Sequence, residues 1–493
     1  MAKALMFQGT GSDVGKSLMV AGLARAYANR GLCVRPFKPQ NMSNNAAIAA
    51  DGGEIGRAQH LQAMAARALP SIHMNPILLK PQADMGAQVI VRGQVRGAAN
   101  ARQYHHLTAD LLAEVLDSYA LNAAGADLIL VEGAGSPAEI NLPGPDIANM
   151  GFAAAANVPV VLVADIDRGG VIAAVVGTHA VLPAPARTRI KGYIINKFHG
   201  DRTLFDGGLT EITARTGWPA LGIAPFFPDA AHLPAEDAVA LDKPVVNNGG
   251  AIKIAVPKLS RIANFDDLDP LNAEPDVSVR LIPPGQTIPG DADLILLPGS
   301  KNTIADLAFL RQQGWDIDIM AHHRRGGRIL GICGGYQMLG KTIRDPDGIE
   351  GATRQADGLG LLAIETILGR EKTLGERAGI HLESGEALQG YEIHLGRSEG
   401  PDRERPFLII DGVADGARSA DGRVEGCYLH GLLRADGFRH AYLAGLQERA
   451  RSGINFAALV EKTLDGLAAH LENHLDLDRM LEIAAAGVTE TSN

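Results

Sequence analysis

One cysteine of this chain lies in a setting suited to nucleophilic chemistry. In RILGICGGYQMLG (328–340), an apolar run precedes Cys333 and two glycines, Gly334 and Gly335, follow it. The apolar run predicts a buried strand and GYQMLG predicts the start of a helix, so Cys333 falls at the sharp turn between them. Free backbone N–H groups at such a helix start can hold an oxyanion. The pattern favours a nucleophile over a buried structural thiol, which is the commoner role of cysteine.

A histidine farther along the chain can act as the base for this thiol. GCYLHGLL (426–433) places His430 just after a short apolar run. Cysteine before histidine, each near a strand end, resembles the layout of triad-type (class I) glutamine amidotransferases. LILLPGSKNT (294–303) is similar to the oxyanion strand of that fold. The resemblance implies that Cys333 and His430 are catalytic, and that Gly299 and Gly334 donate the oxyanion N–H groups.

The third member of such a triad is not evident from the sequence. The common pattern of these amidotransferases has Glu two residues after the histidine, and this chain has Leu432 there. Glu392 and His394 in GYEIHLGRS are alternatives of the right chemical kind. The residue that orients His430 therefore stays open.

A second chemical feature lies at the other end of the chain. A predicted strand leads into GTGSDVGKS (9–17), and a predicted helix follows. Glycine-rich turns of this kind bind phosphate through backbone N–H groups, while the lysine reaches the outer phosphates and the serine binds magnesium. The loop is a variant, because it has Thr10 where the strict pattern has glycine, with Gly9 one residue earlier. The predicted nucleotide ligands are Gly9, Thr10, Gly15, Lys16 and Ser17.

This loop resembles that of dethiobiotin synthetase and its relatives, which use ATP to activate a carboxylate or carbamate. The resemblance implies that Lys38 in RPFKPQ lies near the transferring phosphate, and that Glu132 after LILV binds magnesium. Asp51 in AADGGEIG is predicted as a second magnesium acid, with Glu54 as the alternative. Asn196 in IINKFHGD is similar to the asparagine that reads the base. ATP with Mg²⁺ is thus expected, and no tightly bound organic cofactor.

The elements that position these residues follow an α/β pattern. Continuous apolar runs alternate with helical stretches, which predicts parallel sheets covered on both faces. They are found at 3–9, 32–38, 127–133, 158–165 and 190–197, and again at 251–259, 277–283, 292–299 and 327–333. The predicted units are an ATP-dependent P-loop NTPase-type domain (1–242), a linker (243–250), a flavodoxin-like class I amidotransferase domain (251–447) and a C-terminal helical extension (448–493).

Composition limits the partners and the compartment. Hydrophobic residues make up 46% and charged residues 21% of the 493, a balance typical of globular proteins. The net charge of −10 argues against nucleic acid or an anionic membrane as the main partner. Three widely separated cysteines and the absence of an apolar leader pattern predict a cytoplasmic protein without disulfides. The oligomeric state is not predicted.

Over nearly its whole length the chain resembles the cobyric acid synthase family. FQGTGSDVGKS, NPILLKPQADMGAQVIVRG, VEGAGSPAEINL and GICGGYQMLG carry the resemblance. It implies amidation of the b, d, e and g carboxylates of adenosylcobyrinic acid a,c-diamide, with L-glutamine and ATP as co-substrates. Loops 39–46 and 136–149 are expected to face the corrin. Two alternatives remain: the synthase that amidates carboxylates a and c, and a P-loop ATPase switch with an inactive amidotransferase domain.

Overall fold

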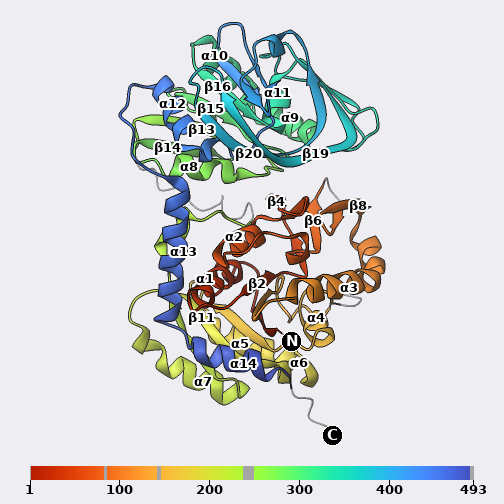
Figure 1. Cartoon of the computed structure of the whole chain (residues 1–493), viewed down its shortest axis with the longest axis vertical. Helices are drawn as coiled ribbons and strands as arrows, with labels where there is room; N and C mark the ends of the chain where they lie inside the picture. The colour runs from red at the N-terminus through yellow and green to blue at the C-terminus, as the bar shows by residue number, and fades with distance from the viewer. Residues whose placement is uncertain (1, 83–85, 142–145, 237–248, 489–493) are drawn as a thin grey trace.

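The computed structural model describes residues 2–82, 86–141, 146–236 and 249–488. Two α/β lobes lie one above the other along the long axis, and the N-terminal lobe is the lower one in Figure 1. Most of the predicted linker 243–250 lies outside the described residues. No helix within the described part of the chain is long and apolar enough to cross a membrane.

The lower lobe is built on a parallel six-stranded sheet with strand order β12-β11-β10-β1-β9-β2. Its strands are apolar on both faces because a helical layer covers each face. The two cores that result lie on opposite sides of the sheet. The strands are β1 (Lys3–Gly9), β2 (Val34–Phe37), β9 (Leu128–Glu132), β10 (Val160–Asp165), β11 (Ile190–Phe198) and β12 (Ala220–Pro225).

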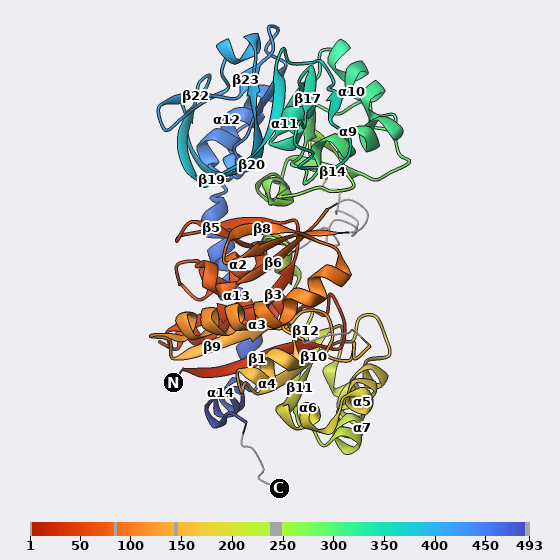
Figure 2. The same cartoon turned by 90° about the vertical axis from the view of Figure 1, so that its right-hand side faces the viewer.

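Short strands inserted after β2 form the top of the lower lobe. A four-stranded sheet and a hairpin lie directly beneath the upper lobe (Figure 2). Four of their apolar residues, Ala46, Ile48, Leu78 and Ile90, share a small core with Tyr391 and Ile393 of the upper lobe. The strands are β3 (Gln40–Met42), β6 (Ile77–Pro81), β7 (Ala87–Val91) and β8 (Gln94–Ala99), with the hairpin β4 (Ala46–Ala49) and β5 (Gly53–Gly56).

The upper lobe has its own sheet, with strand order β14-β13-β15-β16-β24-β23. All of its pairings are parallel except that of the edge strand β23. A long hairpin of β19 (Glu365–His381) and β20 (Ala387–Glu399) belongs to a second sheet. The main strands are β13 (Ile252–Pro257), β14 (Val277–Ile282), β15 (Leu294–Leu297), β16 (Arg328–Ile332), β23 (Ala417–Arg418) and β24 (Val424–Cys427).

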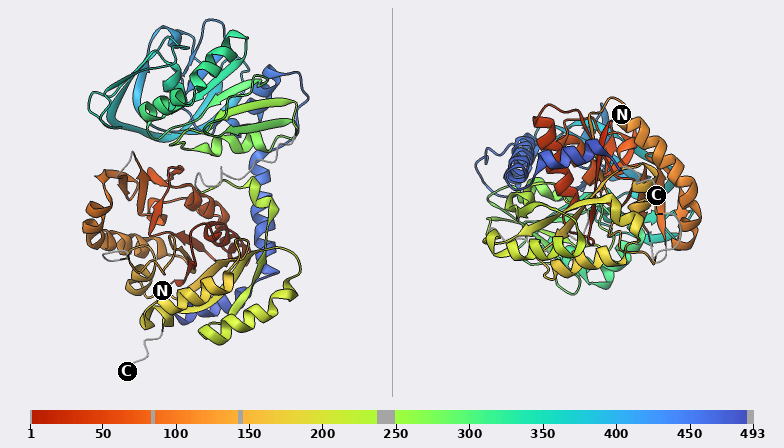
Figure 3. Two further views of the ribbon diagram at one scale, coloured as in Figure 1. Left: turned by 180° about the vertical axis from the view of Figure 1, so that it is seen from behind. Right: turned by 90° about the horizontal axis from the view of Figure 1, so that it is seen from below.

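The C-terminal helices return to the lower lobe. Helix α13 (Phe456–Glu472) runs from the upper lobe down beside the lower one, and α14 (Leu477–Ala486) follows beneath (Figure 3). The apolar stripe of α13 is buried against helix α1 (Lys16–Asn29). Each fully buried leucine of this stripe contributes about 2 kcal/mol to stability. Gly22 of α1 allows this approach, because an added Cβ there would lie 2.8 Å from Leu467. Helix α13 therefore links the upper lobe to the lower lobe, against which it packs.

Candidate functional site

Cys333 lies at the turn between β16 and helix α11 (Gly334–Leu339), at the carboxyl edge of the upper sheet. Its φ of 52° is unusual for a residue with a side chain and indicates a strained turn. The glycine at 335 makes the turn possible, because a Cβ there would overlap the backbone carbonyl of Leu297 on β15. The Cys333 N–H donates to the carbonyl of Cys427, 2.8 Å away. The thiol is thus fixed at the sheet edge where ligands of α/β proteins bind.

His430 lies just beyond β24 and lines the same small cavity as Cys333, whose thiol donates to the carbonyl of Ile393 at 3.8 Å. Nδ1 of His430 lies 2.7 Å from Oδ2 of Asp267, and the other oxygen of that carboxylate accepts from the Gly431 N–H at 2.6 Å. Burial alone lowers the pKa of His430, but Asp267 and Cys333 raise it to about 10. An imidazolium next to a thiolate is the arrangement that activates a cysteine nucleophile.

Asp267 therefore stands in the third position that the sequence left open. It belongs to the 3-10 helix η5 (Phe265–Leu268), which follows β13. Leu432 is a fully buried apolar residue. The two alternatives have other partners, since Glu392 accepts from Arg377 and His394 stacks on Tyr428.

The predicted oxyanion glycines lie on either side of the catalytic pair. A Cβ added to Gly299 would lie 2.9 Å from Cε1 of His430, and one added to Gly334 would lie 2.8 Å from the backbone nitrogen of Ser300. The loop after β15 thus packs directly against the turn that carries Cys333. Both positions require the absence of a side chain, which leaves their backbone beside the thiol.

A small polar cavity of about 50 Å³ opens at Cys333 between the two lobes. Its charged side chains are buried or half-buried, and they suit an amino acid, which carries both a carboxylate and an ammonium group. Burial, Lys372 and Lys80 lower the pKa of Lys301 to about 7, and burial raises the pKa of Glu350 to about 7. The lower lobe contributes Asn44 and Lys80 to the lining, and the upper lobe contributes Lys301, Glu350, Lys372 and His430, among others.

The phosphate loop of the lower lobe is held in place by contacts with neighbouring segments. Gly15 has a φ of 91°, and an added Cβ there would overlap the amide of Asn196. That amide donates to the Val14 carbonyl at 2.9 Å. Lys16 Nζ donates to the carbonyls of Gly11 and Gly135, both at 3.2 Å. Burial, the largest influence, lowers the pKa of Lys16. The loop is held open for a phosphate at the amino end of α1.

The two remaining loop residues lie at the end of β1. The Thr10 N–H donates to the carbonyl of Val163 on β10 at 2.9 Å. A Cβ added to Gly9 would lie 2.9 Å from Lys16 Nζ. Glycine at position 9 thus leaves room for the lysine side chain, although the loop departs from the strict glycine pattern at Thr10.

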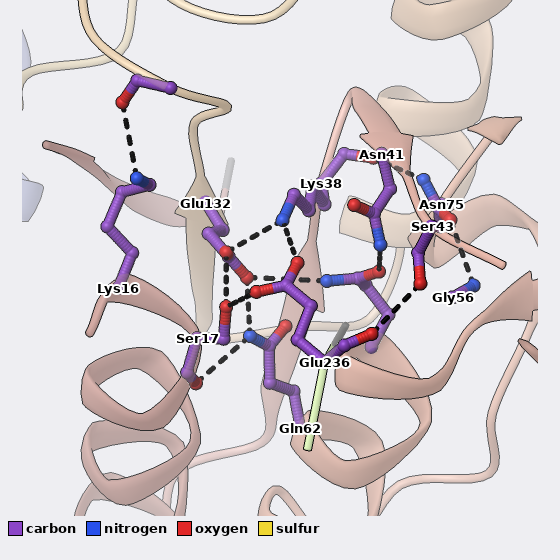
Figure 4. A network of polar contacts seen from close by, with 12 residues as sticks. Lys16, Ser17, Lys38, Asn41, Ser43, Gly56, Gln62, Asn75, Glu132 and Glu236 are labelled. Carbon is purple, nitrogen blue, oxygen red and sulfur yellow. Dashed lines mark hydrogen bonds and ion pairs between the residues drawn. The ribbon is translucent and has the colours of Figure 1, made fainter. Parts of the chain in front are cut away.

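Four side chains of the lower lobe converge beside this loop (Figure 4). Glu132 Oε1 accepts from Ser17 Oγ at 2.7 Å and from Lys38 Nζ at 2.8 Å. Glu236 also contacts Ser17 and accepts from Lys38 Nζ at 2.5 Å. Burial opposes the charge of Lys38, but the two glutamates raise its pKa above the ordinary value. A hydroxyl and two carboxylates are the oxygen ligands that Mg²⁺ prefers, so the donor set fits this ion.

Asp51 does not join this cluster, which corrects its assignment as a metal ligand. It is exposed in the turn between β4 and β5, where its carboxylate accepts from Ser71 Oγ at 2.6 Å and from the Ile72 N–H at 3.0 Å. Its alternative, Glu54, is buried between Lys80 and Lys372 at the lobe interface. The second acid beside the phosphate loop is Glu236. No signal in the sequence marked it, because it follows a proline-containing loop rather than a strand.

A cavity of about 2100 Å³ extends from the phosphate loop across the lower lobe and reaches upper-lobe residues such as Phe265 and Asp269. It is lined at one end by Lys16, Ser17 and Asn196, and elsewhere by residues of loops 39–46 and 136–149. Residues 142–145 of the second loop lie outside the described residues. Pockets for one small ligand usually span about 300–1,000 Å³, so this volume accommodates a nucleotide and a second, large ligand together.

Comparison with known proteins identifies the two lobes separately. Residues 5–240 match the model of the CobQ/CobB/MinD/ParA nucleotide binding domain, and residues 253–438 match that of the CobB/CobQ-like glutamine amidotransferase domain. These matches confirm the predicted α/β fold class.

Full-length relatives named cobyric acid synthase are found in several bacteria. That of Caulobacter sp. (strain K31) is 61% identical over 97% of this chain and 99% of its own length. That of Mesorhizobium japonicum is 58% identical over 98% and 100%, respectively. That of Paracoccus denitrificans is 60% identical over 98% and 99%. The likeness thus spans both lobes and the C-terminal helices.

Proposed function

The chain belongs to the cobyric acid synthase family, the glutamine-hydrolysing, ATP-dependent amidating ligases of cobalamin biosynthesis, and from that premise we propose how its two sites share one reaction. The upper lobe releases ammonia from glutamine. The lower lobe uses ATP to phosphorylate carboxylates of a corrinoid, which the ammonia then converts to amides.

One observation carries this proposal. The Cys333–His430–Asp267 triad faces a cavity that the lower lobe helps to line, and the same lower lobe holds the phosphate loop and the large cavity. A glutaminase whose products only entered solvent would not need residues of another domain around its thiol. The shared cavity supports delivery of the nitrogen to the neighbouring lobe.

In the upper lobe the thiolate sulfur of Cys333 attacks the side-chain carbonyl carbon of glutamine. The oxyanion that forms lies between the backbone of Gly299 and Gly334. His430 then gives its proton to the departing nitrogen, so ammonia leaves and a glutamyl thioester remains. Water, activated by the now neutral His430, hydrolyses the thioester and releases glutamate. Asp267 holds the imidazole in place throughout.

In the lower lobe the carboxylate of the corrinoid must lose an oxygen, and hydroxide is a poor leaving group. Lys16 and Lys38 are placed to hold the phosphate oxygens of ATP while the terminal phosphoryl group moves to the carboxylate. Ser17, Glu132 and Glu236 would hold the magnesium ion, which neutralises phosphate charge. Ammonia then attacks the acyl phosphate and phosphate departs.

The proposed acceptor is adenosylcobyrinic acid a,c-diamide, amidated at carboxylates b, d, e and g. The size of the large cavity supports a corrin-sized acceptor beside the nucleotide. The amide side chains of Gln40 and Asn41, on β3, line this cavity and supply hydrogen-bond partners for a molecule rich in amides and acids. The cytoplasm is the proposed compartment, because the chain has three cysteines without disulfides among the described residues.

A paired assay tests this function. The chain is supplied with ATP, magnesium and cobyrinic acid a,c-diamide, with either glutamine or ammonium as nitrogen source, and the products are identified by mass spectrometry. Amidation at b, d, e and g with both sources is expected. Activity only on a substrate with free a and c carboxylates would favour the earlier synthase. Failure to hydrolyse glutamine under every condition would favour an ATPase switch.

A further inference from the structure

Helix α2 (Arg57–Ala65) of the lower lobe contacts both reaction sites, through Arg57 at its start and through Gln59 and Gln62 farther along. We propose that Arg57 is a positioning residue that couples the glutaminase triad to the state of the ATP site through this helix. The inference rests on the proposed function, and it adds a route by which glutamine hydrolysis depends on the lower lobe.

Arg57 reaches from the lower lobe into the base of the glutaminase site. Its guanidinium lies 3.1 Å from the carboxylate of Asp266 and donates to the hydroxyl of Tyr391 at 2.5 Å. It also donates to the carbonyl of Ala46 at 3.0 Å. Arg57 is 2% exposed, and a buried cation requires partners of this kind. Arg57 and Asp266 thus form a buried ion pair across the lobe interface, as Glu54 and Lys372 do.

One upper-lobe partner of Arg57 contacts the triad histidine, and the other is next in sequence to the acid that orients it. Asp266 precedes Asp267, the residue that orients His430, in the same 3-10 helix. Tyr391 stacks on the His430 ring, with centroids 5.3 Å apart and an 18° angle between the planes. The backbones of Tyr391 and His430 exchange two hydrogen bonds, of 3.0 and 2.9 Å. A displacement of Arg57 therefore changes two supports of one imidazole.

The inner part of the same helix contacts the ATP site. Gln62 donates to Glu132 at 2.6 Å and to the backbone carbonyl of Ser17 at 3.2 Å (Figure 4). Gln59 donates to Glu132 at 3.3 Å. Glu132 is one of the groups proposed to hold magnesium, so metal binding there competes with the hydrogen bonds that it accepts from Gln59 and Gln62. Helix α2 has little freedom to absorb the change, because most of its side chains are buried.

The coupling is measured as the rate of glutamate release in the presence of ATP, magnesium and cobyrinic acid a,c-diamide, divided by the rate in their absence. The amount of amide formed per glutamate is recorded alongside. In the wild-type chain the acceptor mixture should raise the rate. Arg57→Ala should lower this ratio about tenfold, within the usual range of coupling between sites. Ammonia-supported amidation should stay near the wild-type rate, because Arg57 does not touch the ATP site.

Two further variants test the same proposal if Arg57→Ala folds poorly. Arg57→Lys retains the charge and should restore part of the ratio. Tyr391→Phe keeps the ring stacked on His430 but removes the hydroxyl that accepts from Arg57, and should lower the ratio as well. Arg449→Ala is the matched control, since the Arg449 side chain is also buried and pairs with Glu274 and Asp276 of the upper lobe, away from helix α2. It should lower the melting temperature and leave the ratio unchanged.

The inference is overturned if Arg57→Ala and Tyr391→Phe keep the wild-type ratio, or if the wild-type chain hydrolyses glutamine equally fast without the acceptor mixture. A loss of ratio in Arg449→Ala of the same size would also overturn it, because any loosening of the molecule would then suffice. Failure of the proposed function has a different signature: the wild-type chain would not amidate the corrinoid even with ammonium, whatever its rate of glutamate release.

Discussion

The two reaction sites differ in how far the folded chain assembles them. At the glutaminase site, Cys333, His430 and Asp267 are already in contact, and the cavity has a volume of about 50 Å³. At the ATP site the cavity has a volume of about 2100 Å³, and Lys38 pairs with Glu132 and Glu236. The glutaminase site can be assembled before its substrate binds, because glutamine is small. In the ATP site, internal ion pairs must be broken when phosphates and metal bind.

The charges follow the same division. Asp267 and Cys333 raise the pKa of His430 to about 10, so the imidazole holds its proton before glutamine arrives. Lys38 is instead neutralised by the two glutamates that are proposed to hold magnesium. Substitutions that remove a prepared group should therefore abolish one activity outright, whereas those in the exchanging cluster should weaken a binding step.

The largest expected effect separates the two nitrogen sources. Cys333→Ala removes the nucleophile and should lower glutamine-dependent amidation by about a thousandfold or more. Amidation with added ammonium should persist, because the ATP site is intact. Rates with each source, measured on the same preparation, check this. Unchanged turnover with glutamine would show that Cys333 is not the nucleophile.

The corresponding variant at the ATP site is Lys16→Ala. Lys16→Ala should lower amidation by about a hundredfold or more with either nitrogen source, because transition-state charge on the phosphates is no longer stabilised. Product formation with glutamine and with ammonium is compared as before. A chain in which only the glutamine-dependent rate fell would contradict the assignment of the phosphate loop to ATP.

A smaller effect, visible as a pH shift, is expected at Asp267. The pKa of His430 is raised to about 10, so the protonated imidazole should persist well above neutral pH. Asp267→Asn removes the main raising influence, and the alkaline limb of kcat/KM for glutamine hydrolysis should move toward the ordinary histidine pKa of about 6.5. The rate should also fall about a hundredfold. An alkaline limb at the wild-type position would exclude Asp267 as the orienting residue.

The same contrast explains what could be predicted from the sequence. The turn at Cys333 and the phosphate loop are local patterns, with the reactive residue, its glycines and its strand and helix all within a short stretch. Asp267 and Glu236 reach their sites through the fold, from loops whose acids have no distinctive neighbours. Long-range placement of that kind leaves no periodicity or spacing in one sequence.

The inserted strands β3 to β8 were not predicted for a related reason. They are short, and several carry Gly, Asn or Gln where a core strand would carry branched apolar residues. They form the contact with the upper lobe, where the partner surface supplies the missing packing. Helix α2 lies in the same insertion, so the element that contacts both sites was equally hidden, whereas α13 was evident from its apolar stripe.

The smallest expected effects concern Asp51 and Glu236. The sequence predicts Asp51 as the second magnesium ligand, whereas in the structure Glu236 lies beside the phosphate loop. Glu236→Gln removes a carboxylate beside Ser17 and Lys38, and should weaken magnesium-dependent ATP use about tenfold. Asp51→Asn changes only an exposed turn, and should leave the rate unaltered. Amidation with ammonium, titrated with magnesium, checks both variants. If Asp51→Asn raised the magnesium requirement and Glu236→Gln did not, the bound state would have to bring the β4–β5 turn to the phosphate loop, against the arrangement described above.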